Sequence, residues 1–182
     1  MHHVLRFYTA HQELLLKLYI FAAKLSKLPV IGKFVKILMN WYAFTQHGAF
    51  IITPEEAKMV INAATNLAIG DCKCRKIFNN CDDPIRTDIV LGIGHDVFTG
   101  TRKDEYVNID KAEAEKIIDE CSERGLVHSL IKCKGEVYAI CNCCPCCCVP
   151  LRLNKYYGIK HCWSRDKNAV NSFLITLEDQ EV

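Results

Sequence analysis

Cysteine is the residue type in this chain with the most evident chemistry, and its spacing is uneven. The sequence holds 12 cysteines in 182 residues, and six of them fall within residues 141–148. Six neighbouring thiols are poorly placed for disulfides, because each bridge needs a particular geometry and stabilises by closing a loop. Thiolates are soft ligands that suit iron–sulfur clusters, zinc and Cu(I). We therefore interpret the segment as a metal-binding loop from a reducing compartment, and we expect a cytoplasmic protein.

The loop contains more sulfur than one cluster needs. Its six candidate ligands are Cys141, Cys143, Cys144, Cys146, Cys147 and Cys148. The first, third and fifth of them form a CxxCxxC pattern, which is typical of a loop that grips three irons of a [4Fe–4S] cluster. Cys143 and Cys146 form a second, interleaved CxxC pair. Either two clusters lie on opposite sides of the loop, or some of the thiols bind no metal.

A second candidate segment lies about 70 residues earlier in the chain. It contains Cys72, Cys74 and, a little further on, Cys81. Two or three ligands from here, added to others from residues 141–148, would complete a site. Arg75 follows Cys74 directly, and its positive charge would offset the negative charge of a thiolate-bound cluster and shift its potential. Arg75 is therefore a candidate cofactor-binding residue, and simple solvation at the surface is the alternative.

The elements that must position these cysteines read as helices with one hairpin. Apolar periodicity and capping residues predict helices over 11–27, 33–45, 54–70 and 110–125. Strands are expected over 127–132 and 137–140, with a turn at Lys134-Gly135, so that the second strand leads into Cys141. Residues 82–108 read as a loop with a short helix. The expected fold class is mainly α with a small β-hairpin, an α+β fold whose Cys-rich loops bind the cluster.

The N-terminal segment differs in charge from the rest of the chain. Residues 1–50 carry six Lys or Arg against Glu13 alone, although the whole chain has a net charge of only +2. We expect two domains: a basic amphipathic helical docking segment over 1–50, and a Cys-rich cluster-binding domain over 51–182. Residues 11–45 would either pack on protein or lie on an anionic membrane. No stretch is long and apolar enough for a transmembrane helix, and the low net charge argues against nucleic acid.

These segments together resemble a family of Cys-rich, ferredoxin-like iron–sulfur proteins of anaerobic bacteria and archaea. The resemblance rests on Cys72-Lys73-Cys74-Arg75 with Cys81, on Gly125-Leu126-Val127-His128, and on Ile140-Cys141-Asn142-Cys143-Cys144 with the cysteines after it. It covers residues 51–152. Many such relatives continue into a two-cluster ferredoxin module, whose cysteines are lacking here. The resemblance implies an iron–sulfur cofactor more directly than it implies a role.

The leading hypothesis from the sequence is an electron-transfer subunit that holds one or two iron–sulfur clusters, most simply [4Fe–4S], and works with a redox partner protein. A structural zinc site in an interaction module is the first alternative. A cluster-assembly scaffold or a catalytic cluster with an open iron is the second. The sequence shows no paired nucleophile and base, so we expect an accessory subunit rather than a stand-alone enzyme.

Overall fold

The computed structural model describes residues 2–166, 168, 170, 171, 173 and 174. Six strands form one sheet in the order β1-β5-β6-β3-β2-β4, and every ladder between them is antiparallel. The strands are β1 (His47–Ile51), β2 (Leu67–Asp71), β3 (Arg86–Leu91), β4 (Val107–Asn108), β5 (Val127–Cys133) and β6 (Glu136–Cys143). The central strand β6 ends at the start of the Cys-rich loop.

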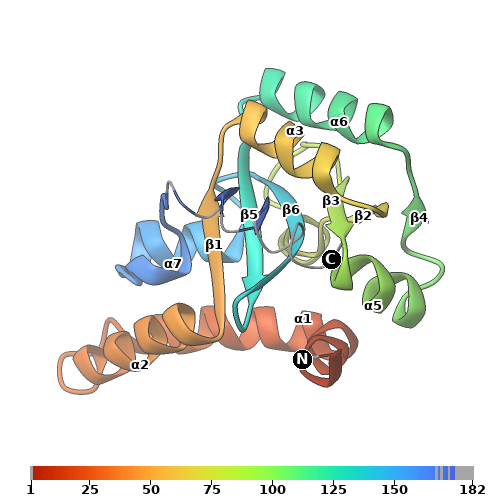
Figure 1. The fold of residues 1–182 in the computed structure, drawn as a ribbon. Coiled ribbons are helices and arrows are strands. Elements are labelled where there is room, and N and C mark those ends of the chain that lie inside the picture. Colours follow the sequence, from red (N-terminus) through yellow and green to blue (C-terminus); the bar gives the residue numbers. More distant parts are fainter. Residues whose placement is uncertain (1, 167, 169, 172, 175–182) are drawn as a thin grey trace.

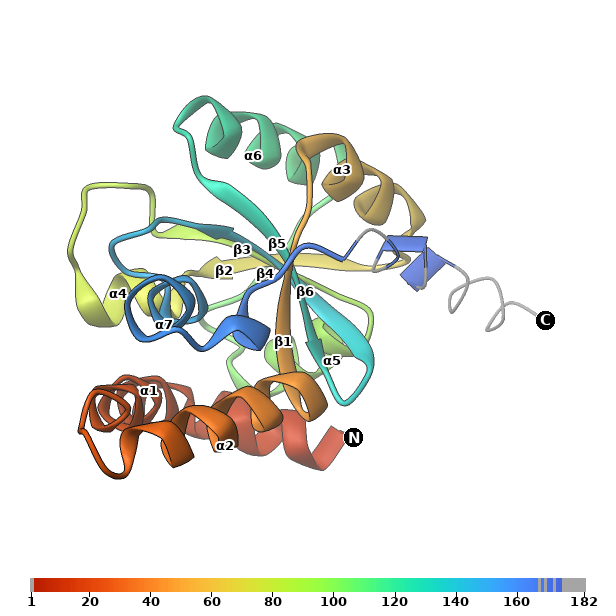
Figure 2. The same ribbon diagram turned by 90° about the vertical axis from the view of Figure 1, so that its left-hand side faces the viewer.

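Helices cover both faces of this sheet, as Figures 1 and 2 show. The helices are α1 (His2–Leu25), α2 (Gly32–Thr45), α3 (Pro54–Ala63), α4 (Lys73–Phe78), α5 (Ile93–Thr101), α6 (Lys111–Glu123) and α7 (Val149–Tyr157), with a short 3-10 helix at Lys160–Cys162. Helices α3 and α6 lie on one side, at the top of Figure 1, and α1 and α2 lie at the bottom, on the opposite side.

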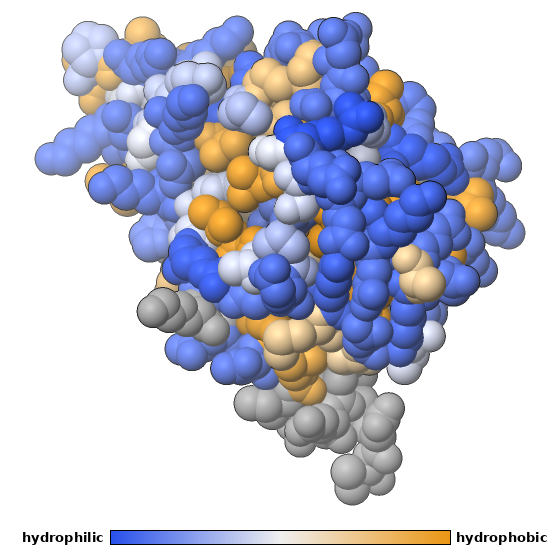
Figure 3. Space-filling view, turned by 90° about the horizontal axis from the view of Figure 1, so that it is seen from above, coloured by the Kyte–Doolittle hydropathy of each residue, from blue (hydrophilic) through white to orange (hydrophobic). Residues whose placement is uncertain are grey.

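The α3–α6 side contains a conventional apolar core. A capping box between Thr53 and Glu56 starts α3, with Pro54 in its first turn. Val60 and Ile61 of α3 and Ile118 of α6 are fully buried against the sheet. The outer surface of this side is largely hydrophilic, with a seam of apolar side chains (Figure 3). The amphipathic pattern of both helices is thus satisfied by the sheet.

The opposite face of the sheet carries α1, α2, α5 and α7, and Cys143 and Cys148 are buried on it. Helix α5 approaches β6 so closely that a Cβ atom on Gly94 would overlap the carbonyl oxygen of Tyr138. Only glycine fits there, because the helix backbone meets the strand backbone directly. This contact fixes α5 beside the strand that leads to the cysteines.

The expected fold class is wrong in its proportions, because the sheet has six strands rather than one hairpin. The hairpin itself and the helix over 110–125 are confirmed as β5, β6 and α6. Four strands, β1 to β4, were missed. Residues 67–71 read as the end of a helix starting at residue 54, and residues 86–91 as loop, but they form β2 and β3. Both are buried on both faces, so neither shows the alternation of a half-exposed strand.

The N-terminal segment joins the same sheet. Strand β1 spans residues 47–51 and pairs with β5, so the boundary expected at residue 50 falls inside a strand. Leu16, Ile20 and Ala23 of α1 are buried in the core that also includes Cys143 and Cys148. Among the described residues, no helix is both long and apolar enough to cross a membrane.

Candidate metal centre

The register of two neighbouring strands brings the distant cysteine segments together. Strand β3 starts at Arg86 and β6 ends at Cys143, and the two run antiparallel with Asp88 opposite Cys141. The start of one strand therefore lies beside the end of the other. The loop before β3 carries Cys81, and the loop after β6 carries the rest of the Cys-rich segment. Strand pairing thus brings together cysteines that are more than 60 residues apart in the sequence.

Four sulfurs meet at this junction, in a group that we call the four-cysteine site: Cys81, Cys144, Cys146 and Cys147. Their Sγ atoms all lie within 4.8 Å of one another. The Cys81 Sγ lies 3.6 Å from that of Cys144 and 3.7 Å from that of Cys147, and the Sγ atoms of Cys146 and Cys147 are 3.8 Å apart. Cys144 and Cys147 are buried, whereas Cys81 and Cys146 are partly exposed. The site therefore reaches from the interior to the surface.

The spacing of these sulfurs fits a single tetrahedral ion. Four thiolates at a metal–sulfur distance of about 2.3 Å would stand roughly 3.8 Å apart, and an all-thiolate tetrahedral set selects zinc or iron. A four-iron cluster binds each thiolate to a different iron, which requires a wider set. The four residues thus suit a single ion better than a four-iron cluster. The site could hold a metal, and its donor atoms do not by themselves choose between zinc and iron.

Polar neighbours hold the two loops of the site in place. The backbone N–H of Asn80 donates to Cys147 Sγ at 3.2 Å, and its side-chain amide donates to the Cys146 carbonyl at 3.1 Å. The Cys148 N–H donates to the Cys144 carbonyl at 3.2 Å, which closes a turn around the site. An amide that donates to a ligand sulfur also stabilises the thiolate form.

The thiols of the site differ in acidity. Burial alone would raise the pKa of Cys144, but hydrogen bonds from Cys146, from the Cys147 backbone and from Arg75 outweigh it and lower that pKa. Burial raises the pKa of Cys81 to about 12, and hydrogen bonding with Cys146 adds to the effect. Cys144 is therefore the thiol of this set that most readily becomes a thiolate before metal binds.

Arg75 is buried, so it is not a solvated surface residue, which was the alternative interpretation of the sequence. Its side chain is 1% exposed, and its guanidinium donates to the carbonyls of Pro84 and Asn142 and, at 3.2 Å, to Thr87 Oγ1. Burial opposes its charge, but the Cys72 and Cys144 thiols overcompensate and raise the pKa of Arg75. Its role in cofactor binding remains a prediction, and its hydrogen bonds connect α4 to the end of β6 and to the start of β3.

The remaining candidates form a separate group, which we call the inner thiols: Cys72, Cys74, Cys141, Cys143 and Cys148. All five line one cavity on the face of the sheet that carries α1 and α2. Cys141 Sγ donates to Asp88 Oδ1 at 3.2 Å, and Ser129 Oγ lies 3.5 Å from Cys143 Sγ. Hydrogen bonds from Cys141 and Cys148 lower the pKa of Cys143 well below its usual value. The sequence grouped Cys72 and Cys74 with Cys81, and the structure separates them.

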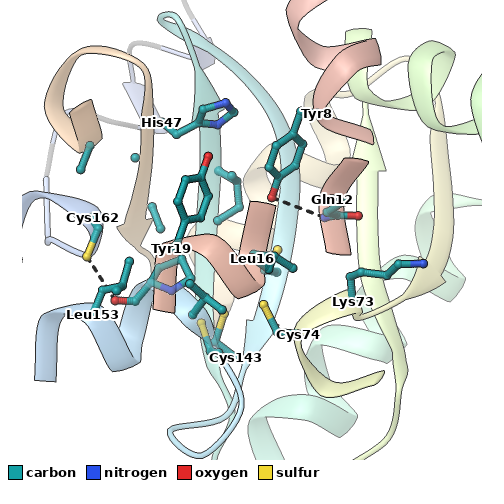
Figure 4. Close-up of a pocket in the computed structure, with 18 of the residues that line it drawn as sticks. Tyr8, Gln12, Leu16, Tyr19, His47, Lys73, Cys74, Cys143, Leu153 and Cys162 are labelled. Atoms are coloured by element: carbon teal, nitrogen blue, oxygen red, sulfur yellow. Dashed lines mark hydrogen bonds between the residues drawn. The ribbon is translucent and has the colours of Figure 1, made fainter. Parts of the chain in front are cut away.

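The cavity beside the inner thiols has a volume of about 420 Å³. Figure 4 shows the Cys74 and Cys143 sulfurs gathered at one end of it, below Leu16, with Tyr8, Tyr19 and His47 around the other end. Helices α1 and α2 contribute its apolar roof, and the sheet and α4 contribute its thiol floor. A cavity of this size is within the range of ligand and cofactor sites.

Sequence reasoning missed a buried polar pair, Asp88 and Tyr106, of which Asp88 lines this cavity. Asp88 accepts a hydrogen bond from the Tyr106 hydroxyl at 2.7 Å, and burial raises the pKa of the Asp88 carboxyl. Asp88 lies in a strand that read as loop, so no signal marked it. His128, which the sequence left aside, bonds Asn142 at 2.6 Å through its ring nitrogen and is a structural residue of the β5–β6 pair.

Comparisons of the chain with family models, curated proteins and solved structures found no match. The resemblance to anaerobic iron–sulfur proteins accordingly stays a prediction. What the fold and the site define is an α+β protein with a cluster of cysteines able to hold a metal.

Proposed function

We propose that the protein is an iron-binding electron-transfer subunit, with the four-cysteine site as its surface-facing metal centre. One observation carries this proposal: four sulfurs within 4.8 Å of one another at the junction of two loops, two of them partly exposed. Iron bound to four thiolates supplies a one-electron couple, and the protein tunes it through charge, hydrogen bonds and exposure.

The residues around the site suit this role. The Asn80 amide directs a donor at Cys147 Sγ, and the Arg75 guanidinium places a buried positive charge beside Cys144. Both favour the more negative, reduced state of a thiolate-bound metal and so raise its potential. Because Cys81 and Cys146 are partly exposed, an electron would have a short path from the site to a partner protein docked over these two residues.

A structural zinc ion is the second candidate, and the same spacing supports it. Zinc would pin the loop before β3 to the loop after β6 and carry no electrons. The protein would then be an interaction module. The two candidates share their ligands, so the identity of the metal decides between them.

The test is metal analysis of protein produced and purified without air. Iron and zinc per chain are measured together with the absorption spectrum and the EPR signal, for the wild type and for Cys81→Ser/Cys146→Ser. Iron that is lost in the double variant, with a spectrum bleached by dithionite, supports the proposal. Zinc with no iron at the site would overturn it, and so would a double variant that keeps its full metal content.

Cys133→Ser is the matched control. Cys133 is also a thiol of this chain, 1% exposed, but it lies at the end of β5 near His47 and outside the four-cysteine site. Its substitution should leave the metal content unchanged. An equal loss of metal from this control would indicate a general effect of removing a thiol rather than loss of a ligand.

A further inference from the structure

The inner thiols do not behave as ordinary core residues. Side chains in a protein interior normally fill the available space and leave few voids larger than a water molecule. Here the five inner thiols, together with Cys144 and Cys162, line a cavity of about 420 Å³ instead of filling it. A set of small apolar residues would collapse onto α1, because a void loses packing energy. The unfilled space beside the thiols points to an occupant.

Spacing distinguishes the inner thiols from the four-cysteine site. Within the part of the chain that the structure describes, the four-cysteine site is the one set of three or more ligand atoms gathered within 4.8 Å. No three inner sulfurs are as close, although all five face the same cavity. A single ion would need them closer together, whereas a polynuclear cluster binds thiolates through different irons and spreads them.

Three elements carry the inner thiols: strand β6 and the first residues of α4 and α7. Residues alternate across a strand, so Cys141 and Cys143 of β6 point to the same face, with Asn142 on the other. Cys72 and Cys74 come from the start of α4, and Cys148 from the start of α7. Arg75 is buried directly behind this floor. Its positive charge would offset the negative charge of a thiolate-bound cluster.

We propose that the inner thiols bind a polynuclear iron–sulfur cluster, separate from the ion of the four-cysteine site. The two centres lie on opposite sides of the 141–148 loop: Cys141, Cys143 and Cys148 serve the inner one, and the other three cysteines of the loop serve the outer one. The cavity gives the cluster room, beneath apolar side chains of α1 and α2. This inference adds a second centre to the proposed function.

The experiment uses anaerobic reconstitution of the full chain with ferrous iron and sulfide. Iron, acid-labile sulfide and visible absorption are measured for the wild type, for the inner variant Cys74→Ser/Cys148→Ser and for the outer variant Cys81→Ser/Cys146→Ser. We expect the inner variant to lose its sulfide and to keep a single metal ion. The outer variant should keep its sulfide and lose that ion.

Several results would overturn the proposal: an inner variant with wild-type sulfide, an outer variant that alone loses sulfide, or a wild-type protein that takes up none. Failure of the four-cysteine site is seen separately, as an outer variant that keeps all its metal. Circular dichroism checks the fold, and Cys72→Ser provides a milder inner substitution if the double variant does not fold. Cys133→Ser is again the control and should keep both centres.

An independent observation concerns the outer surface of α1 and α2. The two helices lie side by side on the face of the molecule away from α3 and α6 (Figures 1 and 2). Large apolar side chains that are 51% to 70% exposed on these two helices include Phe7, Leu14, Leu18, Phe21, Phe34, Ile37, Leu38, Trp41 and Phe44. We call this the α1–α2 face. So many exposed apolar side chains on two adjacent helices indicate an interaction site.

The charges around the α1–α2 face identify its occupant. Lys27 Nζ lies 5.0 Å from the centre of the Tyr157 ring and Lys36 Nζ lies beside Gly158, so both face the end of α7, and the acidic Glu13 is paired with Lys17 at 2.6 Å. Lys24, in the last turn of α1, and Lys33, in the first turn of α2, are the lysines that carry charge to the face. A second copy of the same face would bring like charges together, which is unfavourable. An anionic bilayer attracts these lysines and accepts the apolar side chains of the same two helices. We infer that the α1–α2 face docks in the plane of an anionic membrane.

The test is sedimentation of the protein with vesicles of phosphatidylglycerol or of phosphatidylcholine. We expect binding to the anionic vesicles, weakened by salt and lost in Phe34→Ser/Trp41→Ser. Met59→Ser, on α3 and 49% exposed, is the matched control and should bind like the wild type. Absence of binding at low salt would overturn the inference. Equal binding by the double variant would also overturn it, as would a concentration-dependent dimer that the same variant abolishes.

Discussion

Replacing Arg75 by methionine should strongly destabilise the protein, because the guanidinium donates hydrogen bonds to three buried or partly buried acceptors. Its removal leaves the carbonyls of Asn142 and Pro84 and the Thr87 hydroxyl without that donor. An unsatisfied buried acceptor costs about 1–3 kcal/mol, and the Pro84 carbonyl can regain part of this from water, so we expect a loss of roughly 3–5 kcal/mol. Methionine fills similar space, so little of the loss would come from a cavity.

The assay is urea unfolding of chelator-treated protein, followed by circular dichroism. With an m-value of about 2 kcal/mol/M, the expected loss shifts the midpoint down by roughly 2 M. Arg124→Met, at the exposed end of α6, is the control and should stay within about 0.5 kcal/mol of the wild type. Should Arg75→Met not fold, Arg75→Lys keeps the charge without the fork and should lose less. An Arg75→Met midpoint equal to that of the control would refute the reasoning.

Three further predictions concern the elements around the site. Tyr106→Phe removes the donor to buried Asp88 and should lower the free energy of unfolding by about 2 kcal/mol in the same urea assay, and an unchanged midpoint would contradict the assigned bond. Gly94→Ala forces α5 away from β6 and should lower the melting temperature, whereas Gly100→Ala, in open space on the same helix, should keep or raise it. Burial lowers the pKa of His47 to about 4 from 6.5, so the unfolded chain takes up a proton first and stability should fall between pH 6.5 and 4, by roughly 3 kcal/mol at most. His47→Asn should flatten that part of the stability–pH profile, and an unaltered profile would show that His47 is not the group responsible.

The helices that begin at a capping residue could be predicted from the sequence, whereas the buried strands could not. Asp110 accepts from the Glu113 N–H as expected, and α6 follows. Residues 67–71 and 86–91 lack the period-2 pattern, because helices cover both faces of the sheet there. Their pairing is decided by contacts between distant residues, which a local pattern does not contain.

The division of the cysteines depended on the same missing information. The sequence identified the 141–148 loop and left open whether its sulfurs face one centre or two. Placing Cys81 with Cys144, and Cys72 with Cys141, required the register between β3 and β6. The number of residues between two cysteines does not show on which face of the sheet each will lie, because a shift of one residue in strand register moves a side chain to the other face.

The position of the four-cysteine site at the junction of β3 and β6 has a consequence for the order of assembly. Cys81 and Cys144 are 63 residues apart along the chain and meet when those two central strands pair. The complete ligand set is therefore assembled only after the sheet has formed. Metal binding would stabilise the folded loops late in folding and would not nucleate folding. Chelation of the mature protein should loosen the loops around residues 79–85 and 144–148, while the amides of the central strands remain protected from hydrogen exchange.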